Sequence, residues 1–207
     1  MARPREFSEE RALAAACDAF WEHGYEGTTT RDLVRFTGLT QPSLYNAFGD
    51  KRALFRLALE HYLDHTLRNR IARLERGFTP ALAITAFFAE VIQRSASDTG
   101  QRGCMLVNAV LEKDRHADGL QEAIARELAE IRAFFCRSIA AAQKRREVSK
   151  SVKANDASVH LLTILMGLRV LARTSVERQL LRSAVEVSLV MLGLPGLREA
   201  ENAISSE

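Results

Sequence analysis

Amide, hydroxyl and phenol side chains are concentrated in one short stretch of the chain, at Gln41, Ser43, Tyr45 and Asn46. Such groups can donate and accept hydrogen bonds at the edges of nucleic-acid bases, and amides in particular match adenine. Leu44 and Phe48 are four residues apart and would share the opposite face of a helix. The stretch therefore predicts a helix with a polar outward surface, about the right width for the major groove of DNA.

Two short helices joined by a tight turn must position these side chains. Thr29 or Thr30 can cap the first helix, because a threonine oxygen accepts a backbone N–H that has no partner inside the helix. Gly38 stands where a helix-turn-helix needs a residue free to leave the right-handed region. Thr40 caps the second helix, and Pro42 in its first turn removes no intrahelical hydrogen bond. The pattern predicts a helix-turn-helix over residues 28–51.

The segments AFWEHGYEGTTTRDL and TGLTQPSLYNAFGDKRALF resemble the DNA-binding domain of TetR-family transcriptional regulators, over most of residues 8–60. The resemblance implies that Tyr45 and Lys51 hold phosphates, helped by Thr30 at a helix N-terminus. It places Arg31 within reach of phosphates or bases. At the start of the reading helix it implies DNA contacts by Thr40, Gln41, Pro42, Ser43 and Asn46.

Composition is that of an ordinary globular protein, with 207 residues, 47% apolar residues, 27% charged residues and a net charge of +3. Residues 1–56 hold eight Lys or Arg and eight Asp or Glu, so charge alone does not indicate DNA binding. Three widely spaced cysteines without a CxxC motif suit a reducing compartment, and no signal peptide or membrane-length apolar run is present. We therefore expect a cytoplasmic protein without membrane contact.

Helical periodicity predicts an all-α fold of about nine helices. The resemblance implies an N-terminal helix-turn-helix domain at residues 1–55 and a ligand-sensing and dimerisation domain at 56–207. The boundary is expected within a connecting helix at 51–76. Gly24 is expected to end the first helix, a long helix is expected at 117–146, and Asn155 or Asp156 is expected to cap the helix after it. Thr174 and Glu177 are spaced as a capping box for a last helix, followed by a frayed tail at 197–207.

An apolar pocket is predicted between the helices of residues 80–173. Asn108 and Arg169 are the polar groups that could orient a ligand there. The other predicted lining residues are Phe87, Phe88, Val91, Cys104, Met105, Phe134 and Met166, although the apolar ones could instead fill the core.

Residues 156–192 carry apolar stripes wider than one core face needs, which predicts a four-helix homodimer interface formed with a second copy. The interface residues expected are Leu161, Leu165, Leu181, Ala184, Val185 and Ser188.

The segment RGCMLVNAVLE is similar to one found in a TetR subgroup that contains the repressor of an N-ethylmaleimide-type reductase and a copper-responsive outer-membrane regulator. That resemblance implies that Cys104 senses electrophiles or oxidants. A helix N-terminus and the adjacent Arg102 would favour its thiolate. Burial of Cys104 as a structural residue is the alternative reading.

No GxSxG, HExxH, P-loop or GxGxxG motif is present, and His61 and His65 lack an obvious third metal ligand. We therefore expect no enzyme, no cofactor and no metal. The prediction is a dimeric repressor released from its DNA operator by a small molecule or electrophile. The alternative is an all-helical small-molecule-binding protein or enzyme with a vestigial helix-turn-helix.

Overall fold

The computed structural model describes residues 9–98, 100–112, 120–174 and 177–206, and every regular element within them is a helix. The predicted all-α fold is confirmed. Contacts group the chain into two compact units. The N-terminal unit comprises Met1–Arg68 and Cys104–Gln121, and the C-terminal unit comprises Asn69–Gly103 and Glu122–Glu207. One boundary therefore falls inside the connecting segment 51–76, but nothing in the sequence pattern indicated that Cys104–Gln121 belongs with the N-terminal unit.

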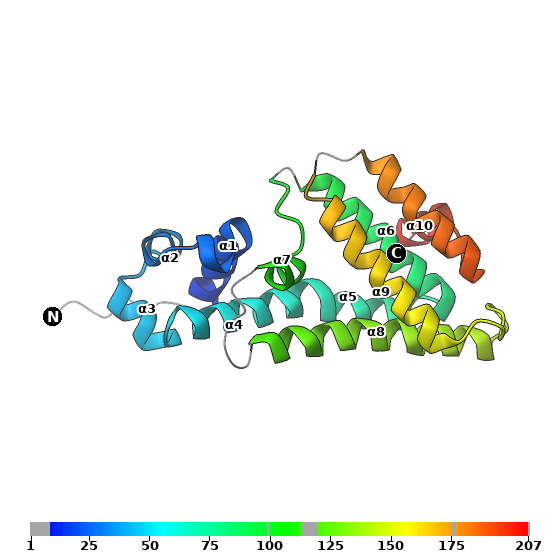
Figure 1. The fold of residues 1–207 in the computed structure, drawn as a ribbon, viewed down its shortest axis with the longest axis horizontal. Coiled ribbons are helices and arrows are strands. Elements are labelled where there is room, and N and C mark those ends of the chain that lie inside the picture. The colour runs from blue at the N-terminus through cyan, green and yellow to red at the C-terminus, as the bar shows by residue number, and fades with distance from the viewer. Residues whose placement is uncertain (1–8, 99, 113–119, 175–176, 207) are drawn as a thin grey trace. The chain divides into compact units, whose positions relative to one another are not determined.

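The N-terminal unit is built around α1 (Glu9–Gly27) and α4 (Lys51–Leu63), which pack against each other. The helix-turn-helix pair is α2 (Thr30–Thr37) and α3 (Gln41–Phe48), and α7 (Met105–Leu111) packs on both α1 and α4 (Figure 1). A π-helical turn, η1 (Asp64–Arg68), follows α4. Phe20 and Phe55 meet edge to face at 4.9 Å in the core, which also buries Leu33, Leu44 and Leu54.

Gly24 ends the regular helix that begins at Glu9, as predicted, and after a kink at this residue a short helical turn completes α1 to Gly27. Gly24 has φ 73° and ψ 175°, a backbone region that is essentially restricted to glycine. A Cβ at this position would lie 2.3 Å from Glu112 Oε1, so any side chain here would require the Glu112 carboxylate to move. The next residue, Tyr25, donates its backbone N–H to the same Glu112 oxygen at 2.8 Å. The end of α7 is thus bonded to the kink of α1.

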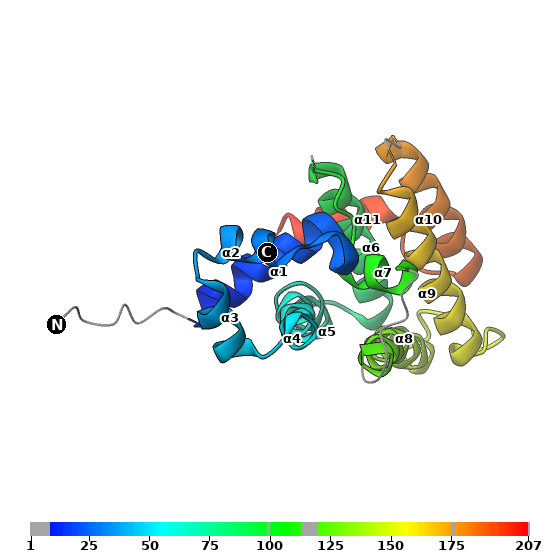
Figure 2. The same cartoon turned by 60° about the vertical axis from the view of Figure 1, so that its left-hand side comes forward.

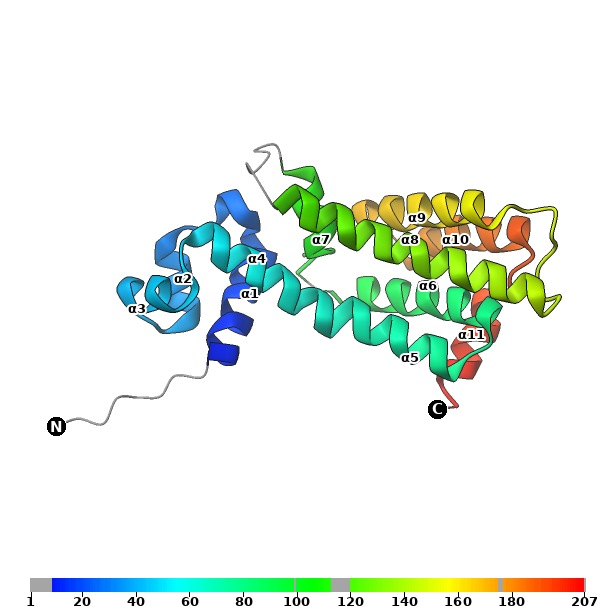
Figure 3. The ribbon, with the colours of Figure 1, turned by 90° about the horizontal axis from the view of Figure 1, so that it is seen from below.

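The C-terminal unit centres on α6 (Pro80–Ser97). Against it pack α5 (Asn69–Gly77), α10 (Arg178–Leu192) and α11 (Leu197–Ile204), while α9 (Ala154–Leu171) packs on α10 (Figures 2 and 3). Four phenylalanines pack between α6 and α8 (Leu120–Lys144). The ring centroids of Phe87 and Phe134 lie 5.6 Å apart, and so do those of Phe88 and Phe135. Within the described residues no single helix is long and apolar enough to cross a membrane. Taken together, α10 and α11 are long and apolar enough, but the chain bends by 103° between them.

Several helix ends differ from their predictions. Residues 197–204 form the packed helix α11 and not a frayed tail, because Leu197 and Ala200 are buried. Glu177 caps α10 without a side-chain bond, and the Thr174 hydroxyl donates instead to the Leu171 carbonyl of α9, so the predicted capping box is not formed. The N-cap of α9 is Lys153 and neither Asn155 nor Asp156. Residues 117–119, where the long helix was expected to begin, lie outside the described residues.

Candidate nucleic-acid interface

The start of α2 is fixed by a capping box between Thr29 and Asp32. Asp32 N–H donates to Thr29 Oγ1 at 3.2 Å, and Thr29 N–H donates to Asp32 Oδ2 at 3.0 Å. Hydrogen bonds from the side chain and then the backbone of Thr29 hold the pKa of Asp32 below its ordinary value. The carboxylate therefore stays charged at neutral pH and fixes the first turn of α2, which carries Thr30.

Glycine and threonine set the turn between α2 and α3 as predicted. Gly38 is left-handed, with φ 68°, and donates its N–H to the Val34 carbonyl at 3.0 Å. Thr40 caps α3 by accepting the Ser43 N–H at 3.4 Å, and the two hydroxyl groups lie 2.9 Å apart. Pro42 occupies the first turn of α3. The chain therefore enters α3 at a defined angle.

The two faces of α3 differ as the sequence predicted. Leu44 and Phe48 are buried against the rest of the N-terminal unit. The opposite side is open to solvent, and its exposed residues are Thr40, Gln41, Pro42, Ser43 and Asn46. The structure thus brings the predicted base-contacting residues together on one polar surface.

Thr30 and Tyr45, predicted to hold phosphates, are brought together although they belong to different helices. Thr30 Oγ1 and Tyr45 Oη lie 2.8 Å apart, and both side chains are half-buried. Arg31, next along α2, is exposed. Lys51 lies with its Nζ 4.5 Å from the centre of the Tyr25 ring, a cation–π contact that restrains the lysine. The two hydroxyls at the first turn of α2 form an arrangement able to bind a phosphate oxygen.

Cys104 is the N-cap residue of α7, with an extended backbone and no side-chain capping bond. Its carbonyl accepts the Asn108 N–H at 2.9 Å, and its side chain is half-buried. Arg102 is paired with Asp98, with Nε 3.5 Å from Oδ1, so its charge already has a carboxylate partner. One residue further on, Met105 accepts the Cys17 thiol at 4.0 Å. Cys104 thus begins a helix that packs inside the N-terminal unit.

The residues predicted to line an apolar pocket are distributed over both units. Phe87, Phe88, Val91 and Phe134 are fully buried in the C-terminal unit. In the same unit Met166 is half-buried, and Arg169 donates to Ser95 Oγ at 3.4 Å. The remaining three, Cys104, Met105 and Asn108, belong to the N-terminal unit. The cavity described below has other lining residues, and the apolar pocket stays a prediction.

Most residues predicted at a dimer interface face inward in the single chain. Leu161, Leu165, Leu181, Val185 and Ser188 are buried, and His160 Nε2 lies 3.1 Å from Ser188 Oγ between α9 and α10. Only Ala184 of the predicted set is exposed. The exposed apolar residues of the same two helices are Val159, Val170, Leu171, Leu180, Val187, Val190 and Met191.

The rings of His61 and His65 lie tilted against each other with centroids 4.1 Å apart, and His65 Nδ1 lies 2.8 Å from the His61 carbonyl oxygen. Burial and the neighbouring His65 lower the pKa of His61. In the described part of the chain no third His, Cys, Asp or Glu side chain completes a metal-binding group with them.

Glu112 was not foreseen as a functional residue. It follows α7 in sequence, yet its carboxylate binds the Tyr25 N–H, three residues before the buried Thr28 that precedes α2. The Thr28 hydroxyl in turn donates to the Gly24 carbonyl at 2.5 Å. The segment that contains Cys104 is therefore connected by hydrogen bonds to the turn from which the helix-turn-helix begins.

A capped helix-turn-helix with an exposed polar second helix, on an all-helical chain with a separate C-terminal unit, defines a DNA-binding regulator. Two family models match the chain: bacterial regulatory proteins of the tetR family at residues 12–58, and the tetracyclin repressor-like C-terminal domain at residues 80–187. The chain belongs to the TetR family of transcriptional regulators, which are not enzymes.

Three relatives illustrate the similarity. The HTH-type transcriptional repressor ComR of Escherichia coli is 32% identical over 178 residues, which cover 83% of this chain and 82% of ComR. A cysteine-substituted CifR, solved in complex with 26-bp operator DNA, is 31% identical and superposes with a TM-score of 0.83. The match covers 92% of this chain and 100% of the CifR chain. Reduced E. coli NemR shares the fold at 17% identity, with a TM-score of 0.80 and coverage of 90% and 97%.

Proposed function

We propose that the protein is a homodimeric repressor that binds a pseudo-palindromic DNA operator and is released from it by a small molecule or an electrophile. The observation that carries the proposal is the exposed row of Gln41, Ser43 and Asn46 on a helix whose other face is buried. ComR is named a repressor, and CifR was solved with operator DNA, which supports the same role here.

The proposed DNA contacts fall into two groups. The first turns of α3 enter the major groove, where the amides of Gln41 and Asn46 form hydrogen bonds with base edges. Thr30, Tyr45 and Lys51 bind phosphates and so set the position of the helix without reading sequence. Because charge within residues 1–56 is balanced, these few contacts and a second copy of the protein must supply the affinity.

The exposed apolar residues of α9 and α10 support dimerisation through these helices. Leu180, Val187 and Met191 repeat at helical spacing along α10 and are 51%, 60% and 71% exposed. A second copy covering this stripe would remove it from water and form a four-helix interface. Such a dimer must place its two reading helices about 34–36 Å apart, one turn of the duplex.

Release by an electrophile is proposed to begin at Cys104. With N-ethylmaleimide, the thiolate adds to one carbon of the ring double bond, forming a C–S bond, and the other carbon takes a proton from water. The adduct is bulkier than a thiol and sits at the start of α7. Because α7 packs on α1 and α4 in the unit that carries α2 and α3, its displacement would act directly on the DNA-reading helices.

A fluorescence anisotropy titration with DNA from upstream of the protein's own gene tests the proposal. We expect saturable binding to one segment, weakening steeply with salt, and no comparable binding to a shuffled sequence. Equal affinity for the specific and shuffled duplexes at low salt would contradict the repressor assignment. N-ethylmaleimide should release the wild-type complex and leave the Cys104→Ser complex intact.

A further inference from the structure

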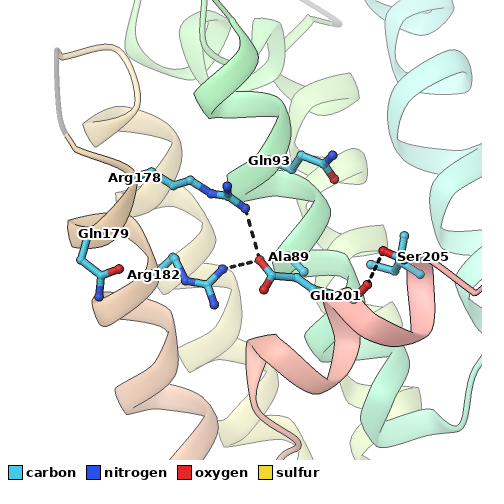
Figure 4. A pocket seen from close by; sticks show the side chains of 8 residues that line it. Ala89, Gln93, Arg178, Gln179, Arg182, Glu201 and Ser205 are labelled. Carbon is cyan, nitrogen blue, oxygen red and sulfur yellow. Dashed lines mark hydrogen bonds and ion pairs between the residues drawn. The ribbon is translucent and has the colours of Figure 1, made fainter.

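A cavity of about 620 Å³ that is open to solvent lies on the C-terminal unit, between α6, α10 and α11. Its polar lining includes Gln93 of α6, Arg178 and Arg182 of α10, and Glu201 of α11 (Figure 4). This volume lies within the range of small-molecule sites in proteins. None of these residues belongs to the predicted apolar pocket or to the surface proposed to read DNA.

Positive charge exceeds negative charge in the lining. Arg178 Nη2 lies 3.2 Å from Glu201 Oε1, and Arg182 Nη1 binds the same oxygen. A guanidinium is protonated at every physiological pH, so two cations share one carboxylate. The carboxylate of Glu186, one turn after Arg182, does not line the cavity and accepts the Leu197 N–H at 3.1 Å.

The two arginines retain donor capacity toward the cavity. Within the described residues, their contacts with Glu201 use one terminal nitrogen of each guanidinium. The Arg178 and Arg182 side chains are 51% and 21% exposed. A guanidinium carries five N–H donors in a planar fork that matches the two oxygens of a carboxylate or phosphate. A second anion can therefore bind beside Glu201.

The remaining lining is mixed. Ala89 of α6 and Ile204 of α11 provide apolar surface, and the exposed amides of Gln93 and Gln179 can donate or accept hydrogen bonds. The Ser205 hydroxyl already donates to the Glu201 carbonyl at 2.9 Å. Apolar surface beside a cationic pair suits a ligand with a charged head and a short hydrocarbon part.

We propose that this cavity binds a small organic anion. Its carboxylate or phosphate group lies between Arg178 and Arg182, and its hydrocarbon part contacts Ala89 and Ile204. The bound anion uses the N–H donors that Glu201 leaves free, and the negative charge of Glu201 opposes its binding. The site is independent of the proposed DNA contacts, so neither proposal depends on the other.

Isothermal titration calorimetry on the full chain tests the proposal with hexanoate, hexyl phosphate, hexanol and sulfate as probes. We expect hexanoate or hexyl phosphate to bind saturably at concentrations up to about 10 mM, and hexanol, which has the same hydrocarbon without the charge, not to bind. The stronger of the two anions identifies the head group. Equal binding of hexanol, or equal binding of sulfate alone, would overturn the organic-anion assignment.

Variants separate this site from general charge effects. The double variant Arg178→Gln/Arg182→Gln should weaken anion binding about tenfold or more. Arg132→Gln, at an exposed arginine on α8, removes a charge elsewhere and should leave anion binding unchanged. Glu201→Gln removes the opposing negative charge and should strengthen binding several-fold, a gain that disrupted folding would not produce. Unchanged affinity in the double variant, or weaker binding in Glu201→Gln with its circular dichroism intact, would refute the proposal.

Discussion

Replacing Glu112 with alanine should weaken both folding and operator binding, because it removes the bond between α7 and the kink of α1. A hydrogen bond to a charged group contributes about 1.5–3 kcal/mol when its surroundings exclude water. Glu112 and Tyr25 are half-buried and not fully removed from water, so we expect a loss of about 1–2 kcal/mol. For a protein of this size that lowers Tm by about 2–8 °C.

Operator affinity should fall in the same variant, since the turn that carries Thr28 and leads into α2 loses its anchor. If the full loss of about 1–2 kcal/mol must be recovered when the turn becomes ordered on DNA, operator affinity decreases by at most about 5–30-fold. Denaturant titration and anisotropy with one operator duplex measure the two effects. Glu112→Gln keeps an acceptor oxygen of the same shape and should lose less. Leu111→Ala truncates the exposed neighbouring residue and serves as the control.

Gly24→Ala probes the same contact from the other side. It places a Cβ 2.3 Å from Glu112 Oε1 and forces alanine into a glycine region, at a cost of about 1–3 kcal/mol for the backbone alone. In the double variant with Glu112→Ala the collision disappears and the backbone strain remains. The stability loss of the double variant should therefore be smaller than the sum of the losses in the two single variants. Wild-type stability and operator affinity in Glu112→Ala would refute the reasoning.

Four further predictions concern other parts of the molecule. Asn46→Ala should cost about 1–3 kcal/mol at particular base pairs, whereas Lys51→Ala should weaken all sequences alike, as selection from a randomised operator library would reveal. Val190→Glu, at a residue 75% exposed in the single chain, should yield a folded monomer, with sedimentation velocity and circular dichroism as the readouts; a persisting dimer would exclude α10 from the interface. The pKa of Asp32 is lowered in the folded state, so its stabilising effect is present above the ordinary carboxyl pKa and lost as pH falls through the lowered value. The difference in Tm between wild type and Asp32→Asn should therefore shrink on acidification. Mass spectrometry after N-ethylmaleimide treatment should find Cys104 labelled before the buried Cys17, and an unlabelled Cys104 in the folded protein would end the sensor hypothesis.

The helix-turn-helix could be predicted closely because its signals are local. A capping threonine, a left-handed glycine and a first-turn proline each act within one or two helical turns, and the structure has all three at Thr40, Gly38 and Pro42. The buried pair Leu44 and Phe48 then decides which face of α3 is exposed. No distant contact is needed to orient this surface.

Long-range packing could not be predicted in the same way. The stripes on α9 and α10 are apolar over more than one face, and the pattern does not say which side meets the protein's own core. Leu181 and Val185 turn inward while Val187 and Val190 remain exposed. Likewise the bond from Glu112 to Tyr25 joins residues far apart in sequence, and no local pattern indicates that they meet.

The placement of α7 has a consequence for folding during synthesis. The ribosome completes α1 to α4 first, but Cys104–Gln121, the second part of the same unit, follows only after residues 69–103 of the other unit. At about 5–20 residues per second the delay is roughly a few seconds. During that time Cys17 lacks its contact with Met105 and the kink at Gly24 lacks Glu112. A nascent chain that stalls in this interval would present the helix-turn-helix on an incomplete support. A recombinant N-terminal domain fused to another protein would need to include residues 104–112.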